Sequence, residues 1–359
     1  MAGKNVLLIT HELSMTGAPI ALHYAAKSYI KNGDYALMLS PQDGPLKKEI
    51  MEDGIAVIID STINGSDFWL KMACNFDLVI VNTLSEFHVI SKLESINIPV
   101  LWWVHESKRS YELGADKVIP LEIKENIHVY CAGPYAKKML NLYRPSYQSD
   151  ILLYGLPEYN FGKETYCYQL DNKEKKIIFV SVGTLEFRKG QDLLVKAIEE
   201  LPKEYLKKIK FIFIGKMVDE NIYQDVCHLL EKYPDCVEMI EQLSRSEIMD
   251  LYKQSDCIIC SSRDDPMPVF ITEALMLSKI CICSENTGTA SLLKDGVNGF
   301  IFKDNDFEQL KEKIITVIEQ YDQLDKMKLE GRKVFEQYFS TSIFRKNLME
   351  ITNSILKKD

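Results

Sequence analysis

Short apolar runs alternate with segments of helical periodicity along the chain of 359 residues, and this alternation constrains the fold more than any other feature. Runs such as NVLLIT and IIFVSVG have the length of a strand and are apolar at consecutive positions, which is typical of parallel strands buried on both faces. Strands separated by helices predict parallel α/β units. The predicted strands cover residues 5–10, 35–40, 55–60, 78–82, 99–104, 128–132, 151–154, 177–183, 209–215, 237–240, 257–261, 280–284 and 299–302.

The length of the chain predicts two domains, because one ordinary core does not grow to this size. The segment 161–176 is polar and charged without a clear period, and we interpret it as a linker. Each half then opens with a strand, a loop and a helix, which indicates two Rossmann-like domains at 1–160 and 177–338 that face a cleft. A final helical stretch is expected to break near Ser340 and to leave a terminal helix at 339–359.

Composition excludes several classes of protein. No apolar run reaches the about 20 residues that cross a bilayer. The N-terminus MAGKNVLLITH runs straight into a strand and lacks the pattern of a signal peptide. The net charge of −9 argues against a nucleic-acid partner, which would require a basic surface. We therefore expect a cytoplasmic protein.

The nine cysteines raise the question of a metal or disulfide site. Cys257 with Cys260, and Cys281 with Cys283, lie in apolar runs that predict buried strands. Side chains alternate along a strand, so Cys257 and Cys260 point to opposite faces, and no nearby histidine completes a zinc-type set. We expect small buried core residues and reduced thiols rather than a metal site.

Residues 261–276, SSRDDPMPVFITEALM, form the motif that says most about function. Pro266 and Pro268 keep the backbone extended, because proline lacks an N–H and restricts its predecessor. A helix is expected to begin near Pro268 and to carry Glu273 in its second turn. The free N–H groups of a helix start form an anion site. We therefore expect a phosphate-bearing ligand whose hydroxyl groups are bound by the carboxylates of Asp265 and Glu273.

This acid pair resembles the acid-x7-acid motif of the retaining glycosyltransferases of family 4 (glycosyl transferases group 1), which have the GT-B fold. Asp265 and Glu273 are eight positions apart, as that motif requires. Two positions depart from it, because the first acid is usually glutamate and Met267 stands where an aromatic residue is common. The resemblance implies that Glu273 holds the nucleotide ribose. It assigns the donor sugar, whose identity the shorter carboxylate leaves open, to Asp265, Met267, Pro268, Val269 and Phe270.

A second loop, VGTLEFRKGQDLL, places Arg188 and Lys189 just before a helix expected to begin near Gln191. Paired cations beside backbone N–H groups suit a diphosphate, although a lone RKG is more often a solvated basic turn. The loop is similar to the G-x(n)-K-G diphosphate loop of family 4, in which an arginine often follows the first glycine. Thr184 stands at that position here. The downstream motif favours the diphosphate role, with Arg188 in place of the missing arginine.

Three further loops carry positions that the resemblance assigns. Gly17, in THELSMTGAP, precedes a helix that Pro19 is expected to open, and its free N–H groups would face the donor phosphates. A tight strand-to-helix turn explains Gly17 equally well. The resemblance also implies phosphate contacts from the turn after the CICSEN run and a nucleotide base packed near the loop at 241–244. The residues concerned are Thr287, Gly288, Thr289 and Leu243.

His105 ends the run PVLWWVHE, at the edge where open sheets bind ligands. An incidental histidine at a strand end is the alternative. In family 4 a histidine at such a position lies beside the transferred sugar, which favours a functional role. Glu106 follows directly and is expected to face away from His105, because adjacent strand residues point to opposite sides.

Two other sequence features have simpler interpretations. Residues 304–306, DND, form the only D-x-D triplet, and we expect them to cap a helix rather than to bind a metal. Lys137, Lys138 and Arg144 lie among apolar residues of 136–144. Family relatives often dock on anionic membranes through basic patches of the N-terminal domain, but a patch this short is more often a solvated helix face.

The resemblance predicts a retaining GT-B glycosyltransferase, of the hexosyl or N-acetylhexosaminyl type, with a UDP-sugar as the expected donor. The acceptor would be a glycan, a lipid-linked molecule or a protein, and the site of action would be the cytoplasm or the inner face of the membrane. No cofactor and no metal are expected, since Arg188, Lys189 and helix dipoles would neutralise the diphosphate. The terminal helix at 339–359 would cross back to pack on the N-terminal domain.

Two alternatives remain open at this stage. A nucleotide-sugar epimerase would need additional acid and base residues, for which the sequence offers no clear set. A non-catalytic GT-B partner subunit would have kept the fold and lost the chemistry. Arg188, Lys189, Glu273 and His105 argue against that reading, whereas Thr184 and Asp265 leave it open.

Overall fold

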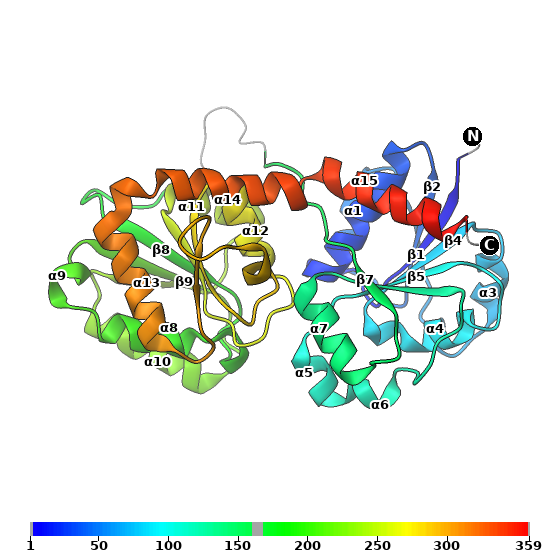
Figure 1. Cartoon of the computed structure of the whole chain (residues 1–359), viewed down its shortest axis with the longest axis horizontal. Coiled ribbons are helices and arrows are strands. Elements are labelled where there is room, and N and C mark those ends of the chain that lie inside the picture. Colours follow the sequence, from blue (N-terminus) through cyan, green and yellow to red (C-terminus); the bar gives the residue numbers. More distant parts are fainter. Residues whose placement is uncertain (1–2, 160–167, 358–359) are drawn as a thin grey trace. The chain divides into compact units, whose positions relative to one another are not determined.

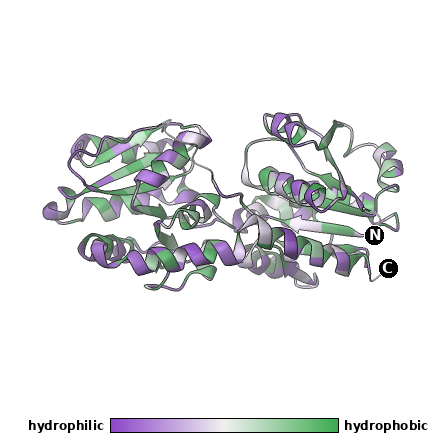
Figure 2. Cartoon of the chain, turned by 90° about the horizontal axis from the view of Figure 1, so that it is seen from above, coloured by the Kyte–Doolittle hydropathy of each residue, from purple (hydrophilic) through white to green (hydrophobic). Residues whose placement is uncertain are grey.

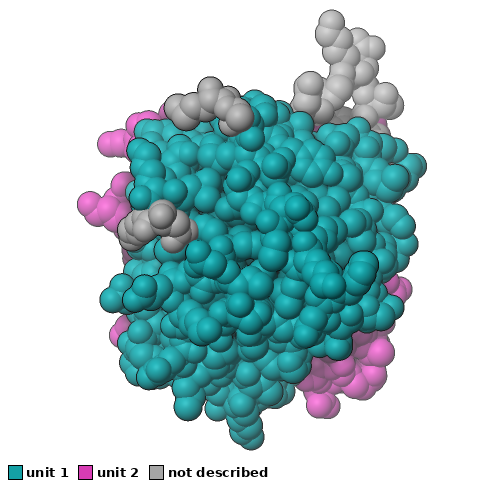
Figure 3. All heavy atoms as spheres, turned by 90° about the vertical axis from the view of Figure 1, so that its right-hand side faces the viewer, with its two compact units in different colours: residues 1–157, 338–359 teal, residues 158–337 magenta. Residues whose placement is uncertain are grey.

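The computed structural model describes residues 3–159 and 168–357 and divides the chain into two compact units (Figure 1). Unit 1 comprises residues 1–157 and 338–359, and unit 2 comprises residues 158–337, as coloured in Figure 3. Part of the predicted linker, 161–167, lies outside the described residues. Residues 168–176 belong to unit 2, where the Tyr168 N–H donates to Asp250 Oδ2 at 3.3 Å and the Leu170 N–H donates to Gln254 Oε1 at 2.9 Å.

Unit 1 is built on a seven-stranded sheet in the order β3-β2-β1-β4-β5-β6-β7, in which every pair of neighbours is parallel. The direction of winding reverses between β1 and β4, so this sheet is doubly wound. Its central strands are fully buried, as their continuous apolar runs require. The strands are β1 (Asn5–Ile9), β2 (Tyr35–Ser40), β3 (Ala56–Ile59), β4 (Leu78–Asn82), β5 (Val100–Val104), β6 (Ile127–Cys131) and β7 (Ser149–Ile151).

Helices connect these strands and cover the sheet. The first begins at Gly17, two residues before the proline that was expected to open it. The connecting helices are α1 (Gly17–Lys31), α2 (Leu46–Glu52), α3 (Phe68–Ala73), η1 (Leu84–Glu86), α4 (Phe87–Leu93), α5 (Lys108–Ser110), η2 (Tyr111–Ala115), α6 (Asp116–Val118) and α7 (Pro134–Tyr143).

The last helix of unit 1, α15 (Thr341–Ile355), comes from the far end of the chain and packs on α1, as predicted. The Tyr29 hydroxyl lies 2.6 Å from Thr352 Oγ1, and the Phe344 ring stacks on Trp103 with centroids 5.9 Å apart. Phe344 also lies against Gly155, where an added Cβ would come within 2.5 Å of the Phe344 Cβ. The terminal helix is therefore an integral part of the core of unit 1.

Unit 2 contains a six-stranded parallel sheet in the order β10-β9-β8-β11-β12-β13, which reverses between β8 and β11. The strands are β8 (Ile177–Val182), β9 (Ile209–Ile214), β10 (Val237–Ile240), β11 (Cys257–Cys260), β12 (Ile280–Ser284) and β13 (Phe300–Phe302). The helices are η3 (Phe187–Lys189), α8 (Gln191–Glu199), α9 (Lys203–Leu206), α10 (Glu220–Lys232), α11 (Arg245–Gln254), α12 (Val269–Met276), η4 (Thr289–Leu292), α13 (Phe307–Gln320), η5 (Tyr321–Gln323) and α14 (Asp325–Tyr338).

Hydrophobic residues concentrate on the strands of both units, whereas the helices show alternating hydrophobic and polar sides (Figure 2). Cys257, Cys260, Cys281 and Cys283 are buried in unit 2, and every cysteine in the described part of the chain is a free thiol. The described ranges contain no group of three histidine, cysteine or acidic residues that could hold a metal. No helix within residues 3–159 and 168–357 is long and apolar enough to cross a membrane.

Candidate functional site

The carboxyl ends of the unit 2 strands bring the predicted ligand-binding loops of this unit to one edge of the sheet. Parallel strands end on the same side, and the reversal between β8 and β11 opens the position where such sheets bind ligands. The loop after β8 leads through η3 to α8, the loop after β11 leads to α12, and the loop after β12 leads to η4. The site is thus assembled from segments far apart in the sequence.

Glycines allow these loops to approach one another. Gly190 has a φ of 68°, and an added Cβ would lie 2.1 Å from the carbonyl oxygen of Ser261. At Gly288 an added Cβ would lie 1.8 Å from the carbonyl oxygen of Pro266. The Ser261 hydroxyl also donates to the carbonyl of Lys189 at 3.0 Å. The loops after β8, β11 and β12 are therefore in backbone contact, and a side chain at either glycine would separate them.

Lys189 and Asp265 form a nearly buried ion pair between two of these loops. Lys189 Nζ lies 2.6 Å from Asp265 Oδ2, and the two side chains are 16% and 7% exposed. The Asp265 carbonyl in turn accepts the Gly288 N–H at 3.0 Å, which fixes the acid to the third loop. A cation and a carboxylate are thus held at the same point of the sheet edge, as the binding of a phosphate next to a polyhydroxylated group requires.

Arg188 is held by a second acid, Glu186, which the sequence interpretation did not identify. Arg188 Nη2 lies 2.9 Å from Glu186 Oε1, and Nη1 donates to the Asp264 carbonyl at 3.0 Å. The Thr184 hydroxyl donates to the same Glu186 oxygen at 2.8 Å. Thr184 and Arg188 therefore converge on one carboxylate, that of Glu186.

Glu273 lies in the second turn of α12 and is paired with Arg245, another residue that the sequence interpretation missed. Arg245 Nη2 is 2.7 Å from Glu273 Oε1, and the acid side chain is only 6% exposed. Burial raises the pKa of the Glu273 carboxyl, and the nearby Arg245 guanidinium opposes that rise. The S-x-x-E capping box of Ser244 and Glu247 was a usable signal for the start of α11, and therefore for the position of Arg245.

Arg263 fixes the predicted phosphate loop through several hydrogen bonds, and the sequence interpretation also missed this residue. Its guanidinium makes two hydrogen bonds of 2.7 Å to the carboxylate of Asp192, in the first turn of α8. The same group donates to the Phe187 carbonyl at 2.6 Å and lies 3.9 Å from the centre of the Phe187 ring. The Arg263 N–H donates to the Arg188 carbonyl at 2.9 Å. The backbone of η3 is therefore fixed before any ligand binds.

The remaining candidates of unit 2 lie on the same edge. Met267 is buried and accepts a hydrogen bond from the Thr289 hydroxyl at 3.4 Å. Leu243 lies in the loop between β10 and α11, and Pro268 is the N-cap residue of α12, one position before the helix begins. The residues that the structure brings together at this edge are Arg188, Lys189, Leu243, Asp265, Met267, Pro268, Val269, Phe270, Glu273, Thr287, Gly288 and Thr289.

In unit 1, His105 directly follows β5 and packs against the Trp103 ring with centroids 4.7 Å apart. Burial, with a smaller contribution from His11, lowers the pKa of His105 to about 3, so its ring is neutral at physiological pH. Its buried Nε2 has no hydrogen-bond partner among the residues described. The Glu106 carboxylate accepts two backbone N–H groups, that of His105 at 2.8 Å and that of Leu84 at 2.6 Å.

Gly17 is the first residue of α1, with Thr16 as an N-cap residue whose side chain makes no capping bond. The neighbouring loop after β4 contains Thr83, with a φ of 77°, and then the buried Glu86. Burial raises the pKa of Glu86 to about 7, and its Oε2 finds no hydrogen-bond donor in the described part of unit 1. Gly17 and His105 therefore share the carboxyl edge of the unit 1 sheet with unsatisfied polar groups.

Two other predictions have clear outcomes. Asp306 is the N-cap residue of α13 and accepts the Gln309 N–H at 2.9 Å, so its predicted capping role is confirmed. Arg144 was placed in a basic surface patch, and this is wrong, because its side chain is buried. Its guanidinium donates to the carbonyls of Asp116, Ile119, Pro120 and Tyr143, and so it organises the turn after α6.

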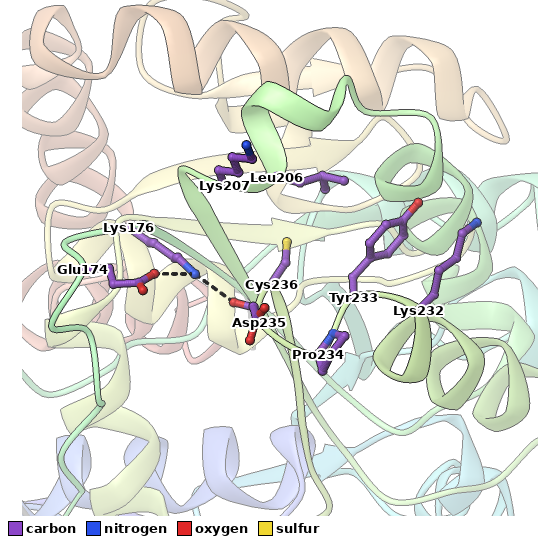
Figure 4. Close-up of a pocket in the computed structure, with 9 residues that line it drawn as sticks. All are labelled: Glu174, Lys176, Leu206, Lys207, Lys232, Tyr233, Pro234, Asp235 and Cys236. Carbon is purple, nitrogen blue, oxygen red and sulfur yellow. Dashed lines mark hydrogen bonds and ion pairs between the residues drawn. The ribbon is translucent and has the colours of Figure 1, made fainter.

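A pocket of about 600 Å³ lies at the other edge of the unit 2 sheet, where β8, β9 and β10 begin (Figure 4). None of the predicted site residues lines this pocket. Lys176 crosses it, with Nζ 2.8 Å from Glu174 and 2.9 Å from the Asp235 carbonyl. The lining residues are Glu174, Lys176, Leu206, Lys207, Lys232, Tyr233, Pro234, Asp235 and Cys236.

Comparison with known proteins identifies related sequences for both halves. Residues 163–334 match the family of glycosyl transferases group 1, and residues 2–126 match glycosyl-transferase family 4. Glycogen synthase of Thermodesulfovibrio yellowstonii is 26% identical over 180 residues, which cover 50% of this chain and 35% of that protein. Spore coat protein SA of Bacillus subtilis is 27% identical over 201 residues, which cover 53% of this chain and 52% of that protein. The chain thus spans about half or less of the length of these curated relatives.

Solved structures resemble the whole chain in fold. Anabaena Alr3699/HepE in complex with UDP has a TM-score of 0.78 at 16% identity, covering 98% of this chain and 100% of that one. A glycosyltransferase from Rickettsia africae has a TM-score of 0.79 at 18% identity, covering 100% of both chains. At these identities the likeness establishes the fold, which is GT-B. The two family matches together extend over most of the sequence, and both halves of the chain thus resemble the group 1, family 4-like glycosyltransferases.

Proposed function

We propose that this chain is a retaining glycosyltransferase that moves a sugar from a UDP-sugar to a hydroxyl group of a glycan, lipid-linked or protein acceptor. The observation that carries the proposal is the meeting of two cation–carboxylate pairs, Lys189 with Asp265 and Arg245 with Glu273, at the carboxyl edge of the unit 2 sheet. Structures of Anabaena Alr3699/HepE, which shares the fold, contain UDP and UDP-glucose, and this supports a uridine donor.

The proposed chemistry places the main catalytic contribution on the departing diphosphate. The bond between the anomeric carbon and the β-phosphate oxygen breaks, while the acceptor oxygen bonds to the same face of that carbon. The acceptor proton passes to the departing diphosphate. Arg188 and Lys189 stabilise the negative charge that develops on the leaving group, where fixed cations contribute most. No protein nucleophile is required.

Recognition of the rest of the donor is divided among the other site residues. Glu273 accepts hydrogen bonds from the ribose hydroxyls, and Leu243 packs near the base. Asp265 and the backbone from Met267 to Phe270 hold the sugar. The resemblance gives His105 a place beside the transferred sugar, where a neutral ring exchanges one hydrogen bond with a hydroxyl group.

The proposal includes transfer of a hexosyl or N-acetylhexosaminyl group without a metal ion. It is supported by Arg188 and Lys189, which supply the positive charge that a metal supplies elsewhere. We further propose that the protein acts in the cytoplasm or at the inner face of the membrane. Since Arg144 is buried and Lys137 lies 3.5 Å from Asp150, any membrane contact of α7 would depend on Lys138 and the exposed Leu142.

Thermal melting against UDP, GDP, ADP and CDP, each with and without EDTA, tests the proposal. A ligand at a hundredfold excess over its dissociation constant adds about 2.7 kcal/mol to the free energy of unfolding. UDP should raise the melting temperature regardless of EDTA, and UDP release from UDP-sugars should then identify the sugar. Glu273→Gln should reduce the UDP effect, because a neutral amide accepts the ribose hydroxyls less well, whereas the exposed Lys196→Met on α8 should leave it unchanged. Absence of any shift would instead favour a non-catalytic partner subunit.

A further inference from the structure

We infer that Arg245 is a positioning residue for the donor site, which keeps the buried carboxylate of Glu273 oriented and charged so that it can accept the ribose hydroxyls. This inference rests on the proposed function and assigns a role to a residue outside the predicted motifs. Arg245 acts through Glu273 and need not touch the donor itself.

The geometry links the starts of two different helices. Arg245 is the first residue of α11, and its guanidinium reaches Glu273 in the second turn of α12 at 2.7 Å. The backbone of Arg245 is fixed by the capping box around it. The Glu247 N–H donates to Ser244 Oγ at 3.3 Å, and the Ser244 N–H donates to Glu247 Oε2 at 2.7 Å. The loop that contains Leu243 is thereby tied to the helix that carries Glu273.

The two side chains differ greatly in exposure. The Glu273 side chain is 6% exposed and the Arg245 side chain is 43% exposed, so the carboxylate is buried and the guanidinium lies closer to solvent. The distance is that of an ion pair, yet Oε1 makes no well-directed hydrogen bond to another residue in the described part of unit 2. The contact therefore supplies charge without satisfying the hydrogen-bonding capacity of the buried Oε1.

The other titratable groups around Glu273 do not replace this charge. Tyr252, seven residues after Arg245, lies on the same face of α11, and its buried hydroxyl has no hydrogen-bond partner in the described residues. Cys281 of β12 interacts electrostatically with Tyr252. Both groups are neutral at physiological pH, because burial raises the pKa of each. Arg245 is thus the group that opposes the effect of burial on Glu273.

A ribose diol presents two hydroxyl donors, which an ionised carboxylate can accept, whereas a protonated carboxyl group loses part of its acceptor capacity. Without Arg245, burial acts on Glu273 unopposed, so its pKa rises further and protonation begins at higher pH. As the pH is lowered, donor binding should then be lost at a higher pH than in the wild type; we call this low-pH loss of binding the acid limb of the profile. A purely structural arginine would lower stability without moving this limb of the pH profile.

The test is the dissociation constant of UDP, measured by calorimetry between pH 5 and pH 8, for the wild type, Arg245→Met and Arg245→Lys. We expect Arg245→Met to shift the acid limb of binding upward by about one pH unit, since an opposite charge at this distance moves a pKa by about 1–3 units and Arg245 is partly exposed. Arg245→Lys should restore most of the wild-type profile. In turnover assays, Arg245→Met should raise the KM for the donor more than it lowers kcat.

Two controls separate positioning from structure. Ser244→Ala removes the capping bond and should lower the melting temperature without moving the acid limb. Glu273→Gln should remove the acid limb, and adding Arg245→Met to it should change UDP binding little. An Arg245→Met profile that coincides with that of the wild type would overturn the inference while leaving the proposed function intact. Failure of the wild type to bind UDP at any pH would refute both.

Discussion

The ion pair between Lys189 and Asp265 makes a quantitative prediction, because each side chain is nearly buried and the two atoms are only 2.6 Å apart. Lys189→Met leaves the carboxylate of Asp265 without its cation in a position that is 7% exposed. Breaking a buried pair from one side costs about 3–5 kcal/mol. Lys189 retains some contact with water, so we expect the lower end, about 3 kcal/mol of lost stability in unit 2. For a unit of this size the loss corresponds to a fall of about 6–12 °C in melting temperature.

A double-mutant cycle isolates this interaction. Asp265→Asn combined with Lys189→Met replaces the pair by two neutral side chains of similar size, and most of the lost stability should return. Urea unfolding of the wild type, both single variants and the double variant provides the coupling energy. UDP binding should be lost in every variant that lacks Lys189. Lys196→Met, on the exposed face of α8, controls for the loss of one positive charge.

The reasoning would be refuted if Lys189→Met melted at the wild-type temperature, or if the double variant were as unstable as the sum of the single variants. The cycle also has a practical consequence for assays of the site. A single substitution at Lys189 changes stability and donor binding together, so a loss of turnover alone does not establish a role in transfer. The double variant separates the two effects.

Three other variants test separate parts of the structure. Burial raises the pKa of Glu86 from 4.5 to about 7, so the folded state binds more protons than the unfolded state between these values. The free energy of unfolding therefore falls as pH rises through that window. Urea unfolding should show Glu86→Gln more stable than the wild type by about 2–3 kcal/mol at pH 8, and no more stable at pH 4. Gly288→Ala would place a Cβ 1.8 Å from the Pro266 carbonyl oxygen, so it should lower the free energy of unfolding by at least about 1–3 kcal/mol and abolish UDP binding. Gly65→Ala, where the nearest atom is 3.8 Å from the added Cβ, should change neither property. Equal melting curves and UDP affinities for the two variants would contradict this expectation. Arg144→Met leaves buried carbonyls without donors and should lower the melting temperature, by about 2–4 kcal/mol of stability, with UDP affinity unchanged; a loss of UDP binding without a loss of stability would contradict its structural role.

Most strands could be predicted because they are apolar runs, which are buried on both faces in a doubly wound parallel sheet. Every predicted strand is present, most within one residue of its expected bounds. The exception is β7, expected at 151–154 and found at Ser149–Ile151. It is an edge strand with Asp150 and Ile151 exposed, so hydrophobicity does not mark its position.

The candidate site could be predicted only where its residues lie in one local motif. Asp265 and Glu273 follow from a single segment, and Arg188 and Lys189 follow from another. The partners that orient them come from elsewhere, and sheet topology alone brings them close. Arg263 and its partner Asp192 are 71 positions apart, and no local pattern connects them. Glu186 was overlooked for a different reason, since an acid beside two cations in a loop has no distinctive spacing.

The composition of unit 1 from two separate stretches of chain has a consequence for the order of events during synthesis. Unit 2 is complete once residue 337 has left the ribosome, whereas unit 1 still lacks α15 at that moment. Until then Trp103 and Gly155 have no Phe344 against them, and the Tyr29 hydroxyl lacks a partner 323 positions away. The hydrophobic surface of unit 1 that α15 covers, around Trp103 and Gly155, therefore stays uncovered until α15 has been made. The contacts of α15 join residues up to 323 positions apart, so they close very long loops, and a chain that lacks α15 would leave the core of unit 1 incomplete.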